Sequence, residues 1–359
     1  MTTVATMIPH SRPAIAQEGL RVVADVLSSG HIAQGACVER FEHEMAAYFG
    51  LQGGVAVSSG TAALELALRA LKIGAGDEVI MPSYVCAAPW LATQRVGARA
   101  TLVDIDLDTL NIDPLAAGRA ITEKTRAIIV PHLFGLPADL AALEKLGVPL
   151  IEDCAQTLGA MVQGRSVGTV GRLTVCSFYA TKLLCAGEGG MVLSDDASLL
   201  ERVRSLREYD GATVLDPSSF NFKLTDLQAA LGLSQLGRLS AFHERRKFLA
   251  ATYREILSSK TVICPNVPPG RTHGYYRFVI RVPSMQAKPD GLMNLIGQLE
   301  QQGIHCRKPV FRPLHRYLDM PGFPRSDEAD RTALSIPLYP DLTGDEVGQI
   351  VQSLGKVLG

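Results

Sequence analysis

The stretch AIIVPHLFGLPADLAALEKLGVPLIED, residues 127–153, shows the pattern that decides the fold. Its apolar runs 127–130 and 149–152 have the length of buried strands, and residues 138–145 between them have the length and periodicity of a helix. Short apolar runs that alternate with helical segments are typical of a largely parallel sheet with helices on both faces. We therefore predict an α/β unit here.

The same alternation continues on both sides, from residue 50 to residue 240. Further strands are predicted at 55–57, 78–81, 99–103, 175–178 and 190–193, which completes a mostly parallel seven-stranded sheet. The helices predicted between them are 61–71, 87–95, 114–121 and 197–208. Helical patterns also precede this unit, at 14–27 and 38–49, and follow it, at 226–236 and 239–257.

A Pro- and Gly-rich crossing at residues 264–271 marks the predicted domain boundary. We expect a large domain over 1–263 and a small α+β domain over 264–359. In the small domain, 275–282 alternates as an antiparallel strand does, and 290–302 and 343–354 read as helices. Thr343 followed by Glu346 predicts a capping box at the start of the last helix.

Composition excludes several classes of protein. With 47% hydrophobic and 20% charged residues among 359, the chain can bury a large core, which excludes a disordered protein. Its 35 Lys and Arg balance 36 Asp and Glu, so it lacks the basic field of proteins that bind a phosphate backbone. We expect no nucleic-acid partner.

The cysteines and the N-terminus indicate a cytoplasmic protein. The seven cysteines are odd in number, mostly lie in apolar runs and show no metal spacing, so we expect free thiols in a reducing compartment and no metal site. Pro9, His10, Arg12 and Pro13 interrupt the N-terminal apolar residues, so we expect no signal peptide. No apolar run reaches the roughly 20 residues of a membrane helix, so we expect no membrane association.

Three short motifs could carry chemistry. SSGTAAL at 58–64 follows a strand and opens a helix, where backbone N–H groups and the helix dipole favour a phosphate; an ordinary helix cap is the alternative interpretation. LIED at 150–153 ends an apolar strand in two carboxylates, at the sheet edge where ligands bind, although Asp153 could instead cap a helix. VCSFYATK at 175–182 leads to Lys182 in an apolar setting that favours a neutral amine, although most lysines are solvated surface charges.

A phosphate site, a carboxylate and a lysine, in that chain order, are the three anchors of pyridoxal 5'-phosphate (PLP). The chain also resembles the DegT/DnrJ/EryC1/StrS family of PLP-dependent sugar aminotransferases from Ile8 nearly to its C-terminus. The stretches that carry the resemblance are SSGTAAL at 58–64, GDEVIMPSY at 76–84, VDIDLDTLNIDP at 103–114, HLFG at 132–135, EDCAQTLGA at 152–160, SFYATK at 177–182, GEGG at 187–190, NFKLTDLQAA at 221–230, PLH at 313–315 and LSIPLYPDLT at 334–343.

The resemblance implies the large-domain fold of aspartate aminotransferase, PLP fold type I, and a role for each matching residue. Lys182 would hold PLP covalently and later move a proton on the substrate, and Asp153 would pair with the ring nitrogen. The residues implied around the cofactor are Gly60, Thr61, Ala62 and Ser177 at its phosphate, Gln156 near its ring, and Asn221, which would reach the phosphate in the neighbouring subunit of a homodimer.

Two positions depart from the family pattern. Cys86 stands where an aromatic residue often covers the ring, and Lys223 replaces the arginine of the Asn-x-Arg motif. Tyr84 is a candidate substrate-binding residue. Tyr84 or Trp90 could also compensate for Cys86 over the ring, although packing in the core is the alternative for both rings. His315 is the candidate substrate ligand on the small domain, whereas we expect His132 to be a hydrogen-bonded core residue.

We thus expect a PLP-dependent aminotransferase that moves an amino group, by implication from glutamate, to a nucleotide-linked keto sugar in a ping-pong cycle. A lysine at 182 favours transamination, because relatives with histidine there dehydrate sugars instead. Two alternatives stay open: a keto cyclitol or another small ketone as acceptor, and a PLP-binding regulatory protein that does not turn over.

Overall fold

The structure is a computed structural model that describes residues 7–210, 216–288 and 290–358. Residues 1–6, on which part of the signal-peptide prediction rests, lie outside this part of the chain. The helices are α1 (Gln17–Ser29), α2 (Ala36–Phe49), α3 (Gly60–Ala70), α4 (Ala88–Arg95), α5 (Pro114–Arg119), α6 (Leu140–Glu144), α7 (Ala197–Arg207), α8 (Asp226–Leu236), α9 (Leu239–Leu257), α10 (Gly291–Gln301), α11 (Leu314–Tyr317), α12 (Pro324–Thr332) and α13 (Gly344–Val357). The strands are β1 (Gly53–Val57), β2 (Glu78–Pro82), β3 (Arg99–Val103), β4 (Thr125–Pro131), β5 (Leu150–Asp153), β6 (Met161–Val162), β7 (Arg165–Ser166), β8 (Leu173–Ser177), β9 (Gly190–Ser194), β10 (Phe278–Arg281) and β11 (Ala333–Ile336).

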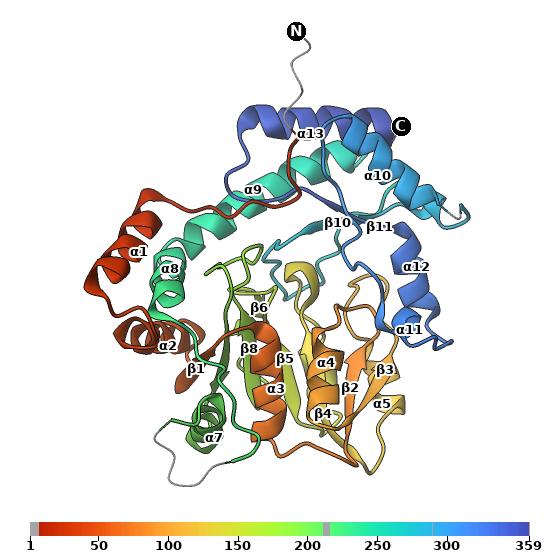
Figure 1. The fold of residues 1–359 in the computed structure, drawn as a ribbon. Helices are drawn as coiled ribbons and strands as arrows, with labels where there is room; N and C mark the ends of the chain where they lie inside the picture. Colours follow the sequence, from red (N-terminus) through yellow and green to blue (C-terminus); the bar gives the residue numbers. More distant parts are fainter. Residues whose placement is uncertain (1–6, 211–215, 289, 359) are drawn as a thin grey trace.

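A seven-stranded sheet in the order β1-β9-β8-β5-β4-β2-β3 forms the centre of the molecule (Figure 1). Strand β9 runs antiparallel to both of its neighbours, and the other neighbouring strands pair in parallel. All seven strands were expected from the sequence within a few residues of these bounds. The predicted α/β fold with a mostly parallel sheet is confirmed.

Alternate residues of each strand pack on opposite faces of this sheet. On one face, residues such as Val57, Ile129 and Val175 form a core with α3, α4 and α7. On the other face, strands β1, β8 and β9 pack against α2 and α8, and strands β2 and β4 pack against α5 and α6. Helices on both faces shield the strands from water, which explains why the strand sequences are apolar throughout.

The C-terminal part of the chain builds a second core around the antiparallel pair β10–β11 (Figure 1). This core also takes in Ile8 and the second half of α9, including Tyr253, which precede the predicted boundary at residue 264. The division into 1–263 and 264–359 therefore stays a prediction. Thr343 and Glu346 form the expected capping box at the start of α13.

Two properties of the described residues concern the predicted compartment. All seven cysteines are free thiols, and Cys154, Cys176, Cys185 and Cys306 are buried. Among these residues, no helix combines the length and the apolar character needed to traverse a bilayer.

Candidate functional site

Segments far apart in the sequence meet where β1 and β8 end. Gly190 at the start of β9 lies opposite both Val57 and Ser177, the last residues of β1 and β8. Helix α3 starts at Gly60, and a Cβ added there would lie 2.7 Å from the Cβ of Ser177. Real Cβ atoms do not approach this closely, so a glycine at position 60 is what lets the start of α3 sit against the end of β8.

The N-terminus of α3 has the properties of an anion site. The Ser59 hydroxyl caps the helix by accepting the N–H of Ala62 at 3.1 Å. Within the described residues, the backbone N–H groups of Gly60 and Thr61 have no acceptor, as the first turn of a helix requires. Gly60, Thr61 and Ser177 therefore come together as expected, whereas the Ala62 N–H, which we expected to face an anion, is already donated to Ser59.

Asp153 ends β5 at the same edge of the sheet and is 9% exposed. Its Oδ1 accepts the N–H of Ala155 at 3.0 Å, and no described cation lies within ion-pair distance of the carboxylate. Burial raises the pKa of this carboxyl, while the Ala155 N–H and the charge of Lys182 oppose that rise. A buried carboxylate of this kind is stabilised when a cationic group binds beside it.

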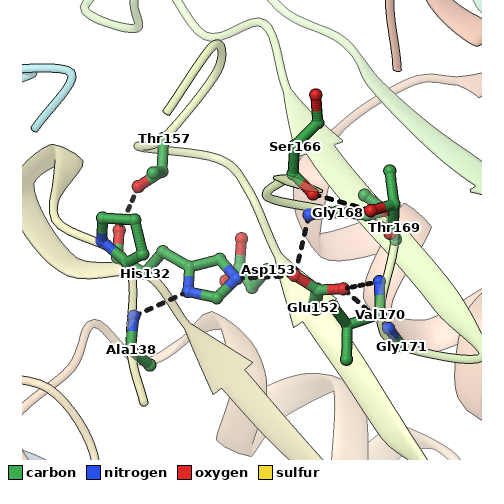
Figure 2. Close-up of polar contacts among 12 residues, drawn as sticks. His132, Ala138, Glu152, Asp153, Thr157, Ser166, Gly168, Thr169, Val170 and Gly171 are labelled. Atoms are coloured by element: carbon green, nitrogen blue, oxygen red, sulfur yellow. Dashed lines mark hydrogen bonds and ion pairs between the residues drawn. The ribbon is translucent and has the colours of Figure 1, made fainter. Parts of the chain in front are cut away.

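His132, which follows β4, is buried and uses both ring nitrogens (Figure 2). Its Nδ1 accepts the backbone N–H of Ala138 at 3.1 Å, so the ring carries its proton on Nε2, which donates to Glu152 at 3.0 Å. The Thr157 hydroxyl donates to the carbonyl of His132. The expected role of His132 as a hydrogen-bonded core residue is confirmed.

Glu152, next to Asp153 on β5, is saturated with hydrogen bonds (Figure 2). Besides His132, the backbone N–H groups of Gly168, Val170 and Gly171 donate to its carboxylate at 2.6–2.7 Å. Although burial raises the pKa of Glu152, the hydrogen bond from His132 and these N–H groups outweigh it and hold that pKa below its usual value. The network fixes the end of β5 and with it the backbone of Asp153.

Ligand atoms of His132, Glu152 and Cys154 lie within 4.8 Å of one another, which is close enough to hold an ion. The hydrogen bonds above already occupy the ring nitrogens and both carboxylate oxygens, however. This cluster is therefore explained as a structural network.

Lys182 lies in the turn after β8, flanked by the buried Leu183. Its Nζ lies 5.2 Å from the ring centroid of Tyr276, and no described carboxylate lies within ion-pair distance of it. Burial raises the pKa of the Asp153 carboxyl and of the Cys86 thiol, and the charge of Lys182 opposes the rise in both. The lysine, the carboxylate and the thiol thus share one electrostatic environment.

Tyr276 is a residue of this site that the sequence did not reveal. Its hydroxyl lies 3.2 Å from the Thr181 hydroxyl and accepts an N–H of Arg277 at 3.4 Å. Burial alone would raise the pKa of this phenol, but the charges of Lys182 and Arg277 outweigh burial and lower it to about 7. The segment 275–282 read as an ordinary strand, and nothing local in it indicates a contact with a lysine so far away in the chain.

The loop after β2 carries Tyr84 and Cys86, and Cys86 lies near Lys182 and Asp153. Cys86 is exposed, although enough protein surrounds its thiol to raise the pKa. Tyr84 is fully buried, packs edge-to-face on Phe134, and has a hydroxyl without a hydrogen-bond partner among the described residues. Gln156 accepts the N–H of Phe134 at 2.8 Å through its Oε1, and its amide N–H groups have no acceptor among the described residues.

The structure corrects the expected role of His315 as a substrate ligand. Its ring is 3% exposed and stacks on Phe323. Both nitrogens are occupied, Nδ1 by the Ser83 hydroxyl at 2.6 Å and Nε2 by Asp327 at 3.0 Å. His315 thus ties α11 and α12 to the loop after β2 and presents no free nitrogen to a ligand.

Asn221 and Lys223 run alongside the end of β1, where Lys223 pairs with Val57. Asn221 is exposed, and Lys223 binds Asp210 at 3.0 Å. The ammonium group at the position of the family arginine is therefore engaged by a carboxylate within the chain. The predicted contact of Asn221 with a neighbouring subunit stays a prediction.

Comparison with known proteins agrees with this arrangement. The model of the DegT/DnrJ/EryC1/StrS aminotransferase family matches residues 13–355. DesV of S. venezuelae, solved in complex with a ketimine intermediate, is 35% identical, with 94% of each chain covered and a TM-score of 0.87. The sugar aminotransferase CalS13 of Micromonospora echinospora is 28% identical, with 98% of this chain and 100% of that chain covered and a TM-score of 0.88. Spr1654 of Streptococcus pneumoniae in its PLP-form is 26% identical, with 98% of each chain covered and a TM-score of 0.91.

Proposed function

The chain belongs to the DegT/DnrJ/EryC1/StrS aminotransferase family, and from that membership we propose that it transfers an amino group from glutamate to a nucleotide-linked keto sugar. It is a PLP-dependent aminotransferase with the fold that the resemblance implied. CalS13 is a sugar aminotransferase, and its similarity to this chain supports a sugar as acceptor. We propose a ping-pong cycle, in which the oxo acid of the donor leaves before the acceptor binds.

The residues present fit PLP at three points. The start of α3, with the free N–H groups of Gly60 and Thr61 and the hydroxyl of Ser177, suits the phosphate. The buried Asp153 carboxylate has no cationic partner among the described residues, and a protonated ring nitrogen would supply one. The amine of Lys182, which has no carboxylate partner within the described part of the chain, suits the aldehyde. When bound, PLP supplies a ring that takes up the electron pair of a Cα–H bond in the amino donor.

The remaining work falls to side chains of this chain. Asp153 would keep the ring nitrogen protonated, because its negative charge stabilises the protonated form. Lys182, once free, would take a proton from the donor as a base and return it as an acid. Cys86 would contact the ring with a polarisable sulfur where relatives have an aromatic ring. Gln156 would donate an amide N–H near the ring.

The observation that carries this proposal is the convergence of the α3 N-terminus, Asp153 and Lys182 around the carboxyl ends of β1, β5 and β8. These groups come from separate parts of the chain, and each suits a different part of one small molecule. An isolated helix cap or a surface lysine would not require the other two to lie nearby.

The test separates donor and acceptor. With glutamate alone, PLP-loaded enzyme should release about one equivalent of 2-oxoglutarate per subunit, and nucleotide keto sugars should then permit turnover. If turnover occurs only with keto cyclitols, the acceptor is a keto cyclitol and not a nucleotide keto sugar. No 2-oxo acid at all, from glutamate or from any other amino acid, would support a PLP-binding protein without turnover.

We also propose a homodimer with shared active sites. Helix α1 and the segment after it expose Leu20, Leu27 and Ile32, at 56%, 57% and 47%, and exposed apolar side chains of this kind suit an interface. Asn221 is exposed near the start of α3, consistent with a contact across such an interface. Light scattering should give twice the chain mass, and a monomer that is fully active would contradict the proposal.

A further inference from the structure

The amine of Lys182 lies against an aromatic ring from a distant part of the chain. Its Nζ is 5.2 Å from the ring centroid of Tyr276, within the range in which the face of an aromatic ring attracts a cation. The Tyr276 hydroxyl lies 3.2 Å from the hydroxyl of Thr181, the residue that precedes the lysine. Tyr276 therefore contacts the turn that carries the amine, and the proposed function gives it no role.

The backbone around Tyr276 is fixed against the loop after β4. Gly274 donates its N–H to the carbonyl of Gly135 at 2.7 Å, and Arg277 donates its N–H to the carbonyl of Phe134 at 3.2 Å. Gly135 has a φ of 104°, and a Cβ there would lie 2.7 Å from the backbone nitrogen of Tyr276. Only glycine permits both this conformation and this close approach. The ring of Tyr276, which is 5% exposed, is thus held at a fixed place beside the lysine.

A buried arginine on α9 holds the same segment from the other end of its side chain. Arg246 is 4% exposed. Its Nη1 donates to the carbonyls of Tyr275 and Tyr276, each at 3.1 Å, and to that of Leu338 at 2.9 Å. Burial lowers the pKa of Arg246 to about 10, and the charge of Tyr276 opposes that effect. Arg246 therefore stays cationic at neutral pH.

Three cations surround the phenol of Tyr276. Besides Lys182 and Arg246, the guanidinium of Arg277 lies 5.1 Å from the ring centroid and donates to the hydroxyl at 3.4 Å. Among the described residues, none of these three has a carboxylate within ion-pair distance. The charges of Lys182 and Arg277 outweigh burial and lower the pKa of Tyr276 to about 7. At neutral pH and above, the phenolate supplies the negative charge that these cations otherwise lack.

The other titratable groups nearby do not replace this phenolate. His10 lines the same small cavity as Tyr276, and burial lowers its pKa to about 3, so its ring is neutral. Asp153 lies near enough for the charge of Lys182 to affect its pKa, but it is the carboxylate that we propose for the ring nitrogen of PLP. Burial raises the pKa of the Cys86 thiol, so this group stays neutral as well.

We propose that Tyr276 is the positioning residue for Lys182: its ring face and hydroxyl hold the lysine's ammonium group at the site whenever that amine is not bonded to PLP. This inference rests on the proposed role of Lys182. In that role the lysine takes a proton and remains an ammonium group until it returns the proton, so a fixed anion beside it serves this stage. Without such a partner, the long and flexible side chain of a lysine samples many conformations.

The experiment measures how fast acetic anhydride acylates Lys182 in cofactor-free protein, read by peptide mass mapping, because only the neutral amine reacts. At about pH 8, Lys182 should react about tenfold or more faster in Tyr276→Phe than in the wild type, since an opposite charge nearby favours the ammonium form. Below about pH 6 the two proteins should react alike, because the phenol of the wild type is then protonated. Tyr276→Phe keeps the buried ring, so it should fold, and circular dichroism checks this.

Tyr275→Phe is the matched control, because the neighbouring Tyr275 stacks on His273, with ring centroids 4.1 Å apart. Lys182 should be acylated in this variant as in the wild type at every pH. In PLP-loaded enzyme, Tyr276→Phe should lower kcat by about tenfold and leave the KM for glutamate nearly unchanged, since it displaces the proton-transferring amine and not the substrate.

Equal acylation of Lys182 in the wild type and in Tyr276→Phe at about pH 8 would overturn the proposal. The same acceleration in Tyr275→Phe, or an unchanged kcat in Tyr276→Phe, would overturn it as well. Failure of the proposed function looks different, because the wild type would then release no 2-oxo acid from glutamate, while the difference in acylation would persist.

Discussion

At the scale of single residues, the site depends on a carboxylate that burial makes unfavourable. Asp153 keeps its place because Glu152 and His132 fix the end of β5 through five hydrogen bonds. The pKa of Asp153 is raised by burial and the pKa of Glu152 is lowered by its donors. Neighbouring acids on one strand thus differ: Glu152 is held in a structural network, and Asp153 is the one that we propose for the cofactor.

Asp153→Asn should reduce turnover by roughly 100-fold or more, because the neutral amide lacks the negative charge that stabilises a protonated ring nitrogen. Steady-state kinetics measure this loss at saturating PLP. Asp345→Asn, at an exposed carboxylate in the first turn of α13, is the control and should leave turnover unchanged. Wild-type rates in Asp153→Asn would contradict the assigned role.

Tyr276 should ionise near pH 7 in cofactor-free protein, because Lys182 and Arg277 outweigh the opposing effect of burial. The phenol of Tyr276 has a pKa near 10 in the unfolded chain, so between about pH 7 and pH 10 the native state has lost this proton while the unfolded state still holds it. The contribution of Tyr276 to the free energy of unfolding therefore increases as the pH rises through this range. Ultraviolet difference titration detects the phenolate.

The transition should be absent in Tyr276→Phe and should move to higher pH in Lys182→Ala, which removes the stronger of the two stabilising charges. If the wild type and Tyr276→Phe titrate identically around pH 7, the contact between Lys182 and Tyr276 does not govern the phenol.

At the scale of elements, the start of α3 depends on its glycine. In Gly60→Ala the new Cβ meets Ser177 at 2.7 Å, so the helix start must move away from the end of β8. We expect PLP affinity to fall by about tenfold or more, measured by fluorescence titration of the cofactor-free protein. Gly348→Ala on α13, where a Cβ meets nothing within 4 Å, should bind PLP normally and keep or slightly raise stability. Equal PLP affinity in both variants would show that close contact between the start of α3 and the end of β8 is not needed to bind the cofactor.

Elements were predictable where the pattern is local. The apolar runs gave all seven central strands, and Thr343 with Glu346 gave the start of α13. Helix α12 and strand β11 were not predicted, because α12 is short and highly polar and β11 pairs with the distant β10. The motifs likewise identified Gly60, Asp153 and Lys182, whereas Tyr276 and the buried state of His315 follow from contacts across the fold that no local pattern carries.

At the scale of the whole molecule, His315 connects parts of the chain that are 232 residues apart. Its bonds to Ser83 and Asp327 hold the loop that carries Cys86 against α11 and α12. His315→Ala should lower the free energy of unfolding by about 1–3 kcal/mol, because it leaves buried polar partners unsatisfied. Denaturant unfolding measures this change. A variant as stable as the wild type with a higher KM for the acceptor would restore the substrate role that the structure argues against.

The central claim is that the phosphate site at α3, Asp153 and Lys182 hold one PLP molecule. Borohydride reduction of PLP-loaded enzyme, followed by peptide mass mapping, tests it most directly, because reduction makes the bond between Nζ and the cofactor's aldehyde carbon permanent. The account predicts a single phosphopyridoxyl adduct on Lys182, which is absent when position 182 is alanine. An adduct on another lysine would contradict it. A protein that binds no PLP, and therefore gives no adduct, would contradict it as well.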